Sequence, residues 1–418
     1  MSIAKFSLTT FLVSIGTVQT VSASDQSDSS GFVAGSKAAI KTRNFYMNRD
    51  NRASGAVQSY GEEWAQGFIG TFQSGFTQGT VGFGADAIGM FGVKLDTGRG
   101  RYGYGTNLME TDSSGPKDEY SKGGGVLKVR LSNTVLKYGT QVSTIPVAYT
   151  SDSRLLPETV TGTTITSKEI KNLTLDAGHL TGLTTKNQST YDTARMTSVD
   201  YVGGAYKFSN WAPGLTGSLY YAKTDDYFKK YYVNGNYQFP LSGKQSIEID
   251  LNAYDTQSIG KAKYGDLDNL IWSAQVFYRV GPHAFSVGYQ KVSGEGDYTY
   301  GIDGGSNYWF GNSIQYSDFD YEDEKSWQLR YDYDFSAMGV PGLGFMTRYV
   351  KGSDFKDGKG NDIDGAAWER DAEFRYIVQS GPAKNLSFAL RQASYRSSER
   401  GGQLDEVRLI TNYTFNIF

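Results

Sequence analysis

Cysteine is absent from this chain of 418 residues, histidine occurs twice, and proline occurs only 8 times. Without cysteine the chain forms neither a disulfide framework nor a thiolate zinc site. The two histidines, His179 and His283, leave little material for metal or acid–base chemistry, and neither lies near a convincing serine nucleophile motif. The sequence therefore argues against an enzyme, and it predicts neither a cofactor nor a metal site.

A strong charge of one sign and long apolar runs are missing as well. The formal net charge of -3 is too close to balance to indicate nucleic acid as a partner. After the N-terminus, no stretch provides the roughly 20 apolar residues that a membrane-spanning helix requires. These observations exclude a nucleic-acid-binding protein and a helical membrane protein.

The N-terminus has the pattern of a secretory signal peptide over residues 1–23. Lys5 provides the positive charge, residues 6–18 are mostly apolar, and the stretch ends on the short residues Val21-Ser22-Ala23. A first strand or a buried helix is the alternative, but the polar segment 24–30 that follows is typical of a new mature N-terminus. The sequence predicts export, cleavage after Ala23, and one mature domain over residues 24–418.

Glycine, tyrosine and phenylalanine are abundant, with 51, 31 and 23 residues. Aromatic residues make up 14% of the chain, yet its mean hydropathy is -0.45. A transmembrane β-barrel reconciles the two values, because each of its strands is apolar on one face and polar on the other. The composition thus favours an all-β protein of this kind.

Strict alternation of apolar and polar residues dominates the chain after the signal peptide. In residues 326–335, Trp327, Leu329 and Tyr331 fall on one face, and Gln328 and Arg330 fall on the other. Comparable alternation occurs over residues 247–253, 272–279, 373–378 and 406–417. A soluble β-sandwich also alternates, but aromatic residues near strand ends and full charges on the polar faces favour a barrel.

Two kinds of connection separate the alternating segments. The tight ones are residues 132–134, 241–244 and 380–382, and the long polar ones are 97–124, 144–171, 294–325 and 352–368. Short turns at one end and long loops at the other are typical of outer-membrane barrels. With roughly 20–22 residues per strand and connection, we expect a transmembrane antiparallel β-barrel of about 18 strands, which leaves a water-filled channel.

Basic residues recur on the polar faces of the alternating segments, which would point into the lumen. One arginine falls on each of the last five expected strands, and earlier strands add further basic positions: Arg330, Arg348, Arg375, Arg391 and Arg408, then Lys41, Arg43, Lys128 and Arg130. Guanidinium groups bind carboxylates in a bidentate manner. The alternative is a lumenal salt network, since Asp332, Glu373 and Glu406 also face inward.

Two loop regions add further hypotheses. Residues 143–158 contain two prolines and apolar residues that an exposed loop would not favour, so this segment is expected to fold inward and narrow the lumen, with Tyr149 and Arg154 at the constriction. The acid-rich stretches 318–324 and 354–364 lack the EF-hand spacing, and solvated loop charge is favoured over calcium binding.

Five blocks of sequence, in order, carry a resemblance to a known family. They are Arg43-Asn44-Phe45-Tyr46-Met47-Asn48-Arg49-Asp50, Glu63-Trp64-Ala65-Gln66-Gly67-Phe68, residues 73–89, Arg154-Leu155-Leu156-Pro157, and residues 312–319. Over essentially the whole mature chain, the sequence resembles the OprD family of substrate-specific outer-membrane porins.

The resemblance implies an 18-stranded monomeric barrel in the outer membrane of a Gram-negative bacterium, with a lumen narrowed by inward-folded loops. It implies a ladder of Arg43, Lys128, Arg130, Arg348, Arg375, Arg391 and Arg408, and an acidic residue of the 294–325 loop, here Asp303, at the constriction. It also implies solutes that bear a carboxylate. The compact loops favour benzoate-like aromatic acids over basic amino acids.

The sequence thus predicts passive uptake of small carboxylate solutes, with outer-membrane lipid and lipopolysaccharide around a monomer or a weak oligomer. A general diffusion porin is the rival in the same class. A barrel hydrolase is the rival in a different class, and it would need a Ser/His or Asp/His site that neither histidine provides.

Overall fold

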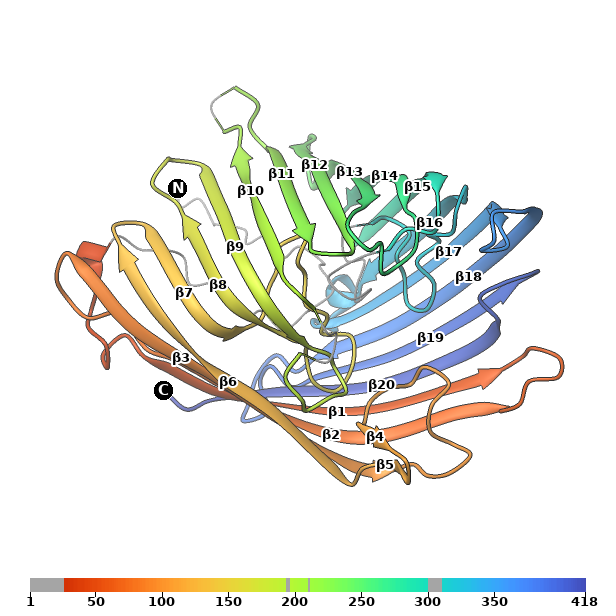
Figure 1. Ribbon diagram of the computed structural model, residues 1–418, viewed down its shortest axis with the longest axis horizontal. Helices are drawn as coiled ribbons and strands as arrows, with labels where there is room; N and C mark the ends of the chain where they lie inside the picture. Colours follow the sequence, from red (N-terminus) through yellow and green to blue (C-terminus); the bar gives the residue numbers. More distant parts are fainter. Residues whose placement is uncertain (1–25, 193–195, 210, 300–309) are drawn as a thin grey trace.

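The computed structural model describes residues 26–192, 196–209, 211–299 and 310–418. Apart from a two-stranded hairpin, the strands form one closed antiparallel barrel of 18 strands, in which each strand pairs with its neighbour in sequence and the last, β20, pairs with the first, β1 (Figure 1). The expected fold class and strand number are confirmed. The predicted signal peptide, residues 1–23, lies outside the described residues and stays a prediction.

The barrel strands vary in length between 8 and 16 residues. They are β1 Lys37–Asn51, β2 Tyr60–Gln73, β3 Val81–Asp96, β6 Glu119–Leu131, β7 Thr134–Gln141, β8 Thr159–Ser167, β9 Leu173–Thr184, β10 Val199–Lys207, β11 Leu215–Thr224, β12 Phe228–Pro240, β13 Gln245–Ser258, β14 Asp268–Val280, β15 His283–Glu295, β16 Lys325–Asp334, β17 Leu343–Lys356, β18 Asp362–Ile377, β19 Ser387–Ser397 and β20 Gln403–Asn416. The hairpin is β4 Thr111–Asp112 with β5 Gly115–Pro116, and two short 3-10 helices, η1 Gln26–Asp28 and η2 Phe335–Met338, complete the elements.

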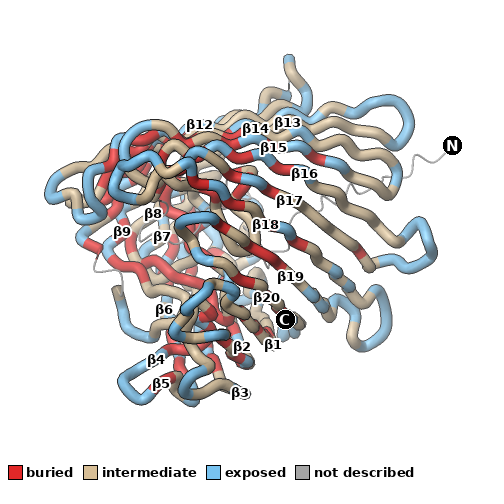
Figure 2. Tube along the Cα trace, turned by 90° about the vertical axis from the view of Figure 1, so that its right-hand side faces the viewer, coloured by how far each residue is buried: buried red, intermediate tan, exposed pale blue. Residues whose placement is uncertain are grey.

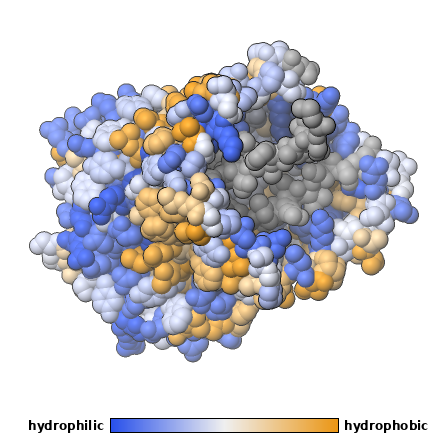
Figure 3. Space-filling view, turned by 180° about the vertical axis from the view of Figure 1, so that it is seen from behind, coloured by the Kyte–Doolittle hydropathy of each residue, from blue (hydrophilic) through white to orange (hydrophobic). Residues whose placement is uncertain are grey.

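Burial alternates along the strands as the sequence pattern predicts. In β16, Ser326 and Gln328 are 1% exposed and face the lumen, whereas Trp327 and Leu329 on the opposite face are 40% and 51% exposed. Buried and exposed residues alternate along the strands in the same way elsewhere in the barrel (Figure 2), and the large apolar side chains of β16 lie on its outer face. In the view from behind, hydrophobic residues gather in patches across the middle and lower part of the surface (Figure 3). None of the helices in the described ranges is long and apolar enough to span a membrane.

The connections at the two ends of the barrel differ in length. The end that carries residue 26 and the C-terminus has the short turns, among them residues 132–133, 241–244 and 281–282. The opposite end has the three connections 97–118, 142–158 and 296–324. By the rule for outer-membrane barrels, the first end is periplasmic and the second is extracellular.

Three of the expected long loops are shorter in the structure than the sequence predicts. Residues 97–124 include the start of β6, which begins at Glu119, and residues 144–171 include the whole of β8, which spans Thr159–Ser167. The expected loop 352–368 is wrong, since β17 and β18 continue through it and only residues 357–361 join them. Its acidic and glycine-rich composition makes a tight hairpin turn, in which Asp357 accepts hydrogen bonds from the backbone N–H groups of Lys359 and Asn361.

Candidate functional site

Three extracellular connections fold into the lumen, where they form the candidate site. We call residues 97–118 the first lumen loop, residues 142–158 the second, and residues 296–324 the third; the third is described except for 300–309. In Figure 1 the second lumen loop, in yellow, lies inside the ring of strands. The inward folding predicted for residues 143–158 is therefore present.

Apolar side chains anchor these loops to opposite parts of the wall. Leu108 and Met109 of the first lumen loop and Leu155 of the second are fully buried against Phe45 and Ala65 of the wall. On the far side, a second cluster joins the second and third loops to tyrosines of the wall; it includes Val147, Ala148, Tyr298, Phe310, Tyr232 and Tyr254. Burial of this area holds the loops inside the lumen.

Charged side chains of the wall bind the backbone of the loops, and Glu63 on β2 is the most extensive case. It is 1% exposed, and its carboxylate accepts hydrogen bonds from the backbone N–H of Leu108 (2.6 Å), the backbone N–H of Met109 (3.1 Å) and the hydroxyl of Thr106 (2.7 Å). A buried carboxylate with several N–H donors is well satisfied. Glu63 therefore fixes the first lumen loop to the barrel wall.

Arg43 on β1 holds the second lumen loop in a comparable way. Its two terminal nitrogens bind both carboxylate oxygens of Asp152, at 2.7 and 2.9 Å, and one of them also donates to the carbonyl of Arg154 at 2.5 Å. Burial alone would raise the pKa of the Asp152 carboxyl, but the Arg43 guanidinium outweighs it and holds that pKa below its usual range. The loop is therefore attached by a charged pair at neutral pH.

The third lumen loop is bound from the other side of the barrel. Glu369 on β18 is fully buried and accepts hydrogen bonds from the backbone N–H groups of Tyr316 and Ser317, each at 2.8 Å. Arg408 on β20 donates to the carbonyl of Gln315 at 2.7 Å. The backbone at residues 315–317 is thus fixed by one acidic and one basic wall residue.

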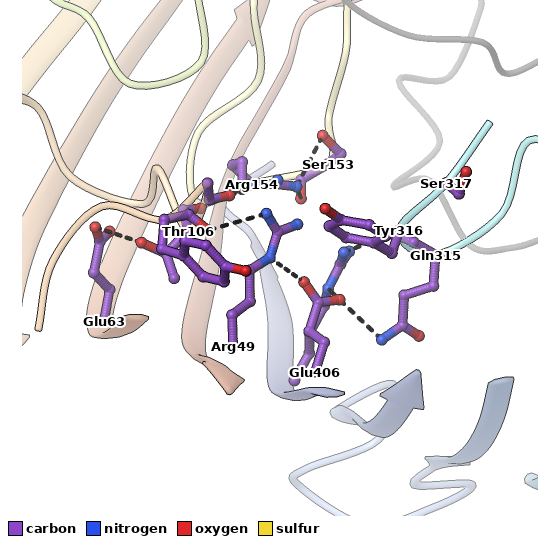
Figure 4. A network of polar contacts seen from close by, with 12 residues as sticks. Arg49, Glu63, Thr106, Ser153, Arg154, Gln315, Tyr316, Ser317 and Glu406 are labelled. Atoms are coloured by element: carbon purple, nitrogen blue, oxygen red, sulfur yellow. Dashed lines mark hydrogen bonds and ion pairs between the residues drawn. The ribbon is translucent and has the colours of Figure 1, made fainter. Parts of the chain in front are cut away.

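The three loops meet at a network that Figure 4 shows from close by. Glu406 on β20 binds Arg49 (2.6 Å), Arg408 (2.5 Å) and the side-chain amide of Gln315 (3.0 Å). Arg154, from the second loop, donates to the backbone carbonyls of Thr106 and Gly105 in the first loop, at 2.7 and 3.1 Å. This network joins the three lumen loops to β1 and β20.

Arg154 is a cation held in a basic environment. Burial, together with the nearby Arg408 and Arg49, lowers the pKa of its guanidinium from the ordinary value. A guanidinium remains charged in proteins, so the network holds three cations, Arg49, Arg154 and Arg408, around the carboxylate of Glu406. The constriction is therefore electrically favourable for an anion.

The inward arginines of the last strands lie next to one another on the wall. Arg330 on β16 pairs directly in register with Arg348 on β17, and Arg391 on β19 pairs with Arg408 on β20. Each is matched with a carboxylate, in the pairs Arg330–Asp332 (2.7 Å), Arg348–Asp371 (2.7 Å), Arg391–Glu373 (2.5 Å) and Arg408–Glu406 (2.5 Å). The predicted positions are on adjacent strands, and they form the lumenal salt network that is the alternative to a row of unpaired arginines.

Two of these ion pairs leave part of the guanidinium available. Arg348 and Arg391 use Nε for their carboxylate partners, and their side chains are 13% and 24% exposed. Among the described residues, no hydrogen-bond acceptor is bound by their terminal nitrogens Nη1 and Nη2. The edge that these two nitrogens form is suited to a second carboxylate.

Other predicted site residues are placed apart from this row. Lys128 and Arg130 on β6 are buried near the periplasmic end, where Lys128 pairs with Asp86. Arg375 lies on β18 beyond Glu373, toward the periplasmic end. Tyr149 is buried within the second lumen loop, so it packs the loop rather than lining an opening. Asp303 lies outside the described residues.

Among the residues that bind the loops, only Arg43, Arg154 and Arg408 were predicted from the sequence as site residues. Arg49 and Glu63 lie in the family blocks and on the lumenal face by alternation with Arg43 and Ala65. This alternation could have indicated that the side chains of Arg49 and Glu63 face the lumen. Their partners are groups of distant segments of the chain, which no sequence pattern reveals.

Each histidine contacts a residue of a neighbouring strand. His179 pairs with Asp200 at 2.7 Å and is half exposed, and His283 contacts the hydroxyl of Tyr331 at 2.8 Å next to a periplasmic turn. Within the described ranges, no group of three or more histidine or acidic residues is arranged to hold a metal ion.

Glu324, at the end of the third lumen loop, gives a pH-dependent prediction. Its side chain is 1% exposed, one carboxylate oxygen accepts the backbone N–H of Tyr321, and burial raises its pKa to about 8. Between these two pKa values, the carboxyl is neutral in the folded protein but ionised in the unfolded chain. The free energy of unfolding therefore falls as the pH rises from about 4.5 to about 8. We expect Glu324→Gln to raise the temperature of unfolding at pH 9 and to leave it unchanged at pH 4.

The temperature of unfolding is measured by heating samples stepwise and following the loss of the compact, fast-migrating form in gel electrophoresis. The matched control is Glu295→Gln, an exposed residue at the end of β15. Equal stabilisation by Glu324→Gln at both pH values would contradict the assignment.

The fold and the loop-built constriction define an outer-membrane channel of the porin class. The sequence model of the family described as "outer membrane porin, OprD family" matches residues 30–417. Porin D of Pseudomonas aeruginosa is 41% identical, over the full length of both chains. The chain therefore belongs to the OprD family, and it is a substrate-specific porin of the Gram-negative outer membrane.

Solved structures agree with this assignment. A BenF-like porin from Pseudomonas fluorescens Pf-5 is 34% identical with a TM-score of 0.88, and the match covers 93% of this chain and all of that one. OpdK of Pseudomonas aeruginosa, in a structure with vanillate, is 34% identical with a TM-score of 0.84, and the match covers 92% of this chain and all of that one.

Proposed function

We propose that this porin conducts small solutes that bear a carboxylate, with benzoate-like aromatic acids preferred over basic amino acids. The observation that carries the proposal is the available edge of Arg348 and Arg391 on the lumen wall. Each guanidinium is oriented by an acidic partner through Nε, so a solute carboxylate meets a fixed pair of donors. The similar OpdK, whose structure contains vanillate, an aromatic carboxylate, supports this solute class.

Passage would proceed by exchange between weak sites. A solute carboxylate would approach the positive charge around Arg154, then move along the wall between Arg391 and Arg348. Conduction needs sites that attract a solute and still release it, and the acidic partner of each arginine limits how tightly an anion binds. The process is passive, and it needs no cofactor.

Basic amino acids are the second candidate, because carboxylates alternate with the arginines. Asp332 and Glu373 lie within the same row and are partly exposed to the lumen. They would contact the cationic group of such a solute while an arginine binds its carboxylate. Outer-membrane lipid and lipopolysaccharide would surround the apolar outer face, and one chain would form the channel.

The test is solute uptake into proteoliposomes that contain the purified protein. Labelled benzoate, arginine and a neutral sugar of similar size are compared for the wild type and for Arg391→Ala. We expect benzoate uptake to exceed sugar uptake and to fall roughly tenfold in the variant, which corresponds to ~1.4 kcal/mol for one hydrogen bond to a charged group.

Arg396→Ala is the matched control for this experiment. Arg396 lies on the same strand and pairs with Asp405, on the opposite face from Arg391. It should leave uptake unchanged. Faster uptake of arginine than benzoate would select the second candidate, and equal uptake of all three solutes would leave a general diffusion pore.

A further inference from the structure

The N-terminal end of the described chain lies inside the barrel, against the basic residues of β6. Gln26, in η1, is 3% exposed, and its backbone N–H donates to the carbonyl of Ser132 in the periplasmic turn that follows β6. A Cβ atom at Gly82, on the lumenal face of β3, would meet the Gln26 side chain at 2.3 Å. The glycine at position 82 therefore makes the space that Gln26 occupies.

The side-chain amide of Gln26 binds Arg130 and is itself fixed. Its oxygen accepts a hydrogen bond from Nε of Arg130 at 2.7 Å, and its nitrogen donates to the carbonyls of Thr77 and Gly79 at 2.8 and 3.0 Å. An amide oxygen on a guanidinium Nε takes a position that a solute carboxylate oxygen would otherwise take. Gln26 thus occupies the Nε side of the Arg130 guanidinium.

An aromatic ring covers the other side of the same basic residues. Phe76, in the turn between β2 and β3, lies 4.3 Å from the Arg130 guanidinium and 4.9 Å from the Lys128 ammonium, measured to the ring centroid. Lys128 also donates to the carbonyl of Ser74 at 2.7 Å and pairs with Asp86. As a result, Lys128 and Arg130 are only 4% and 3% exposed.

The covering segment is attached along its length. The hydroxyl of Ser29 donates to the carbonyl of Phe76 at 2.5 Å, and the backbone N–H of Gly75 donates to the carbonyl of Phe32 at 2.8 Å. Residues 26–36 and the turn 74–80 therefore form one cover over the periplasmic end of β6. We call these residues the N-terminal cover.

We propose that the N-terminal cover masks Lys128 and Arg130 from the lumen and so ends the anion path before it reaches the periplasmic mouth. The side chains of Arg348 and Arg391 are 13% and 24% exposed on the lumen wall, whereas these two basic residues near the exit are withdrawn. An anion that passes the constriction then meets two fewer exposed cations on this part of the wall. The cover makes release into the periplasm easier, since conduction requires sites that let the solute leave.

Ion selectivity in planar bilayers tests the masking itself. The reversal potential is measured in a KCl gradient for the wild type, Gln26→Ala and the control Gln379→Ala, whose side chain is exposed in the periplasmic turn after β18 and donates to the carbonyl of Ile377. We expect Gln26→Ala to raise the chloride-to-potassium permeability ratio about twofold, because one more uncovered charge lies within a screening length of the path. The control should match the wild type.

Two further variants separate masking from a structural role. Gln26→Glu loses the hydrogen bonds to Thr77 and Gly79 but keeps an oxygen on Arg130, so its ratio should not exceed that of the wild type. In an Arg130→Gln background, Gln26→Ala should change nothing. A rise with Gln26→Glu, a rise without Arg130, or no rise with Gln26→Ala would each overturn the proposal. Heat-dependent electrophoretic mobility verifies that every variant is folded.

The release step rests on the proposed carboxylate function, and a separate measurement addresses it. Current interruptions caused by added benzoate should last longer in Gln26→Ala than in the wild type. A changed reversal potential with no interruption by benzoate in either protein would refute the proposed solute and the release step, while the masking of Arg130 would stand.

Discussion

Glu63→Ala is expected to free the first lumen loop and to give a channel with frequent transitions to a larger conductance. The substitution removes three hydrogen bonds from a buried carboxylate and leaves the N–H groups of Leu108 and Met109 unpaired. For a loss of about 4 kcal/mol, the equilibrium for local opening of the loop shifts roughly a thousandfold. Single-channel recording measures the transitions directly.

Glu119 supplies a matched control for this prediction. It follows the first lumen loop directly, at the start of β6, but its side chain is exposed on the outer face. Glu119→Ala should keep the wild-type conductance. The same steady conductance in Glu63→Ala would show that apolar packing of Leu108 and Met109 alone holds the loop.

Arg43→Met is expected to be strongly destabilising, and Asp152→Asn in the same chain is expected to restore much of the loss. The single substitution leaves the buried carboxylate of Asp152, within the described part of the chain, with Lys41 as its remaining ion-pair partner, whose ammonium lies 3.8 Å away. Breaking one partner of a buried pair costs about 3–5 kcal/mol, whereas removing both charges costs much less. The temperature of unfolding and benzoate uptake are the two measurements.

The pH gives an independent check on this pair. Because the pKa of Asp152 lies below its usual range, its contribution is complete above the ordinary carboxyl range and is lost as the pH falls below about 4. The difference between wild type and Arg43→Met should therefore shrink under acid conditions. Additive effects of the two substitutions at neutral pH would contradict the coupling.

The sequence was sufficient to predict the barrel, because the alternation of apolar and polar residues repeats from strand to strand. Alternation fixes which residues face the lumen, and Arg330, Arg348 and Arg391 accordingly lie on the inner wall as predicted. Composition misled at residues 352–368, where charged and glycine residues indicated a loop. Strands of this barrel extend to the extracellular rim, and there a polar strand has the same composition as a loop.

The constriction could be predicted only in part. Prolines and apolar residues marked residues 143–158 as an inward loop, and its position in the lumen agrees. The contacts that hold it, such as Arg43 with the carbonyl of Arg154, join a side chain to a backbone group 111 residues away. Every residue carries the same backbone groups, so the identity of such a partner leaves no trace in the sequence.

The network at Glu406 joins the two strands that the chain makes first and last. Arg49 on β1 and Glu406 on β20 are register partners across the barrel seam, as are Arg43 and Asn412. Contacts between residues so far apart form late in folding, because the intervening chain must be ordered first. During assembly the filter is therefore completed only when the barrel closes, and a chain that stops before β20 would lack both the wall and the means to discriminate among solutes.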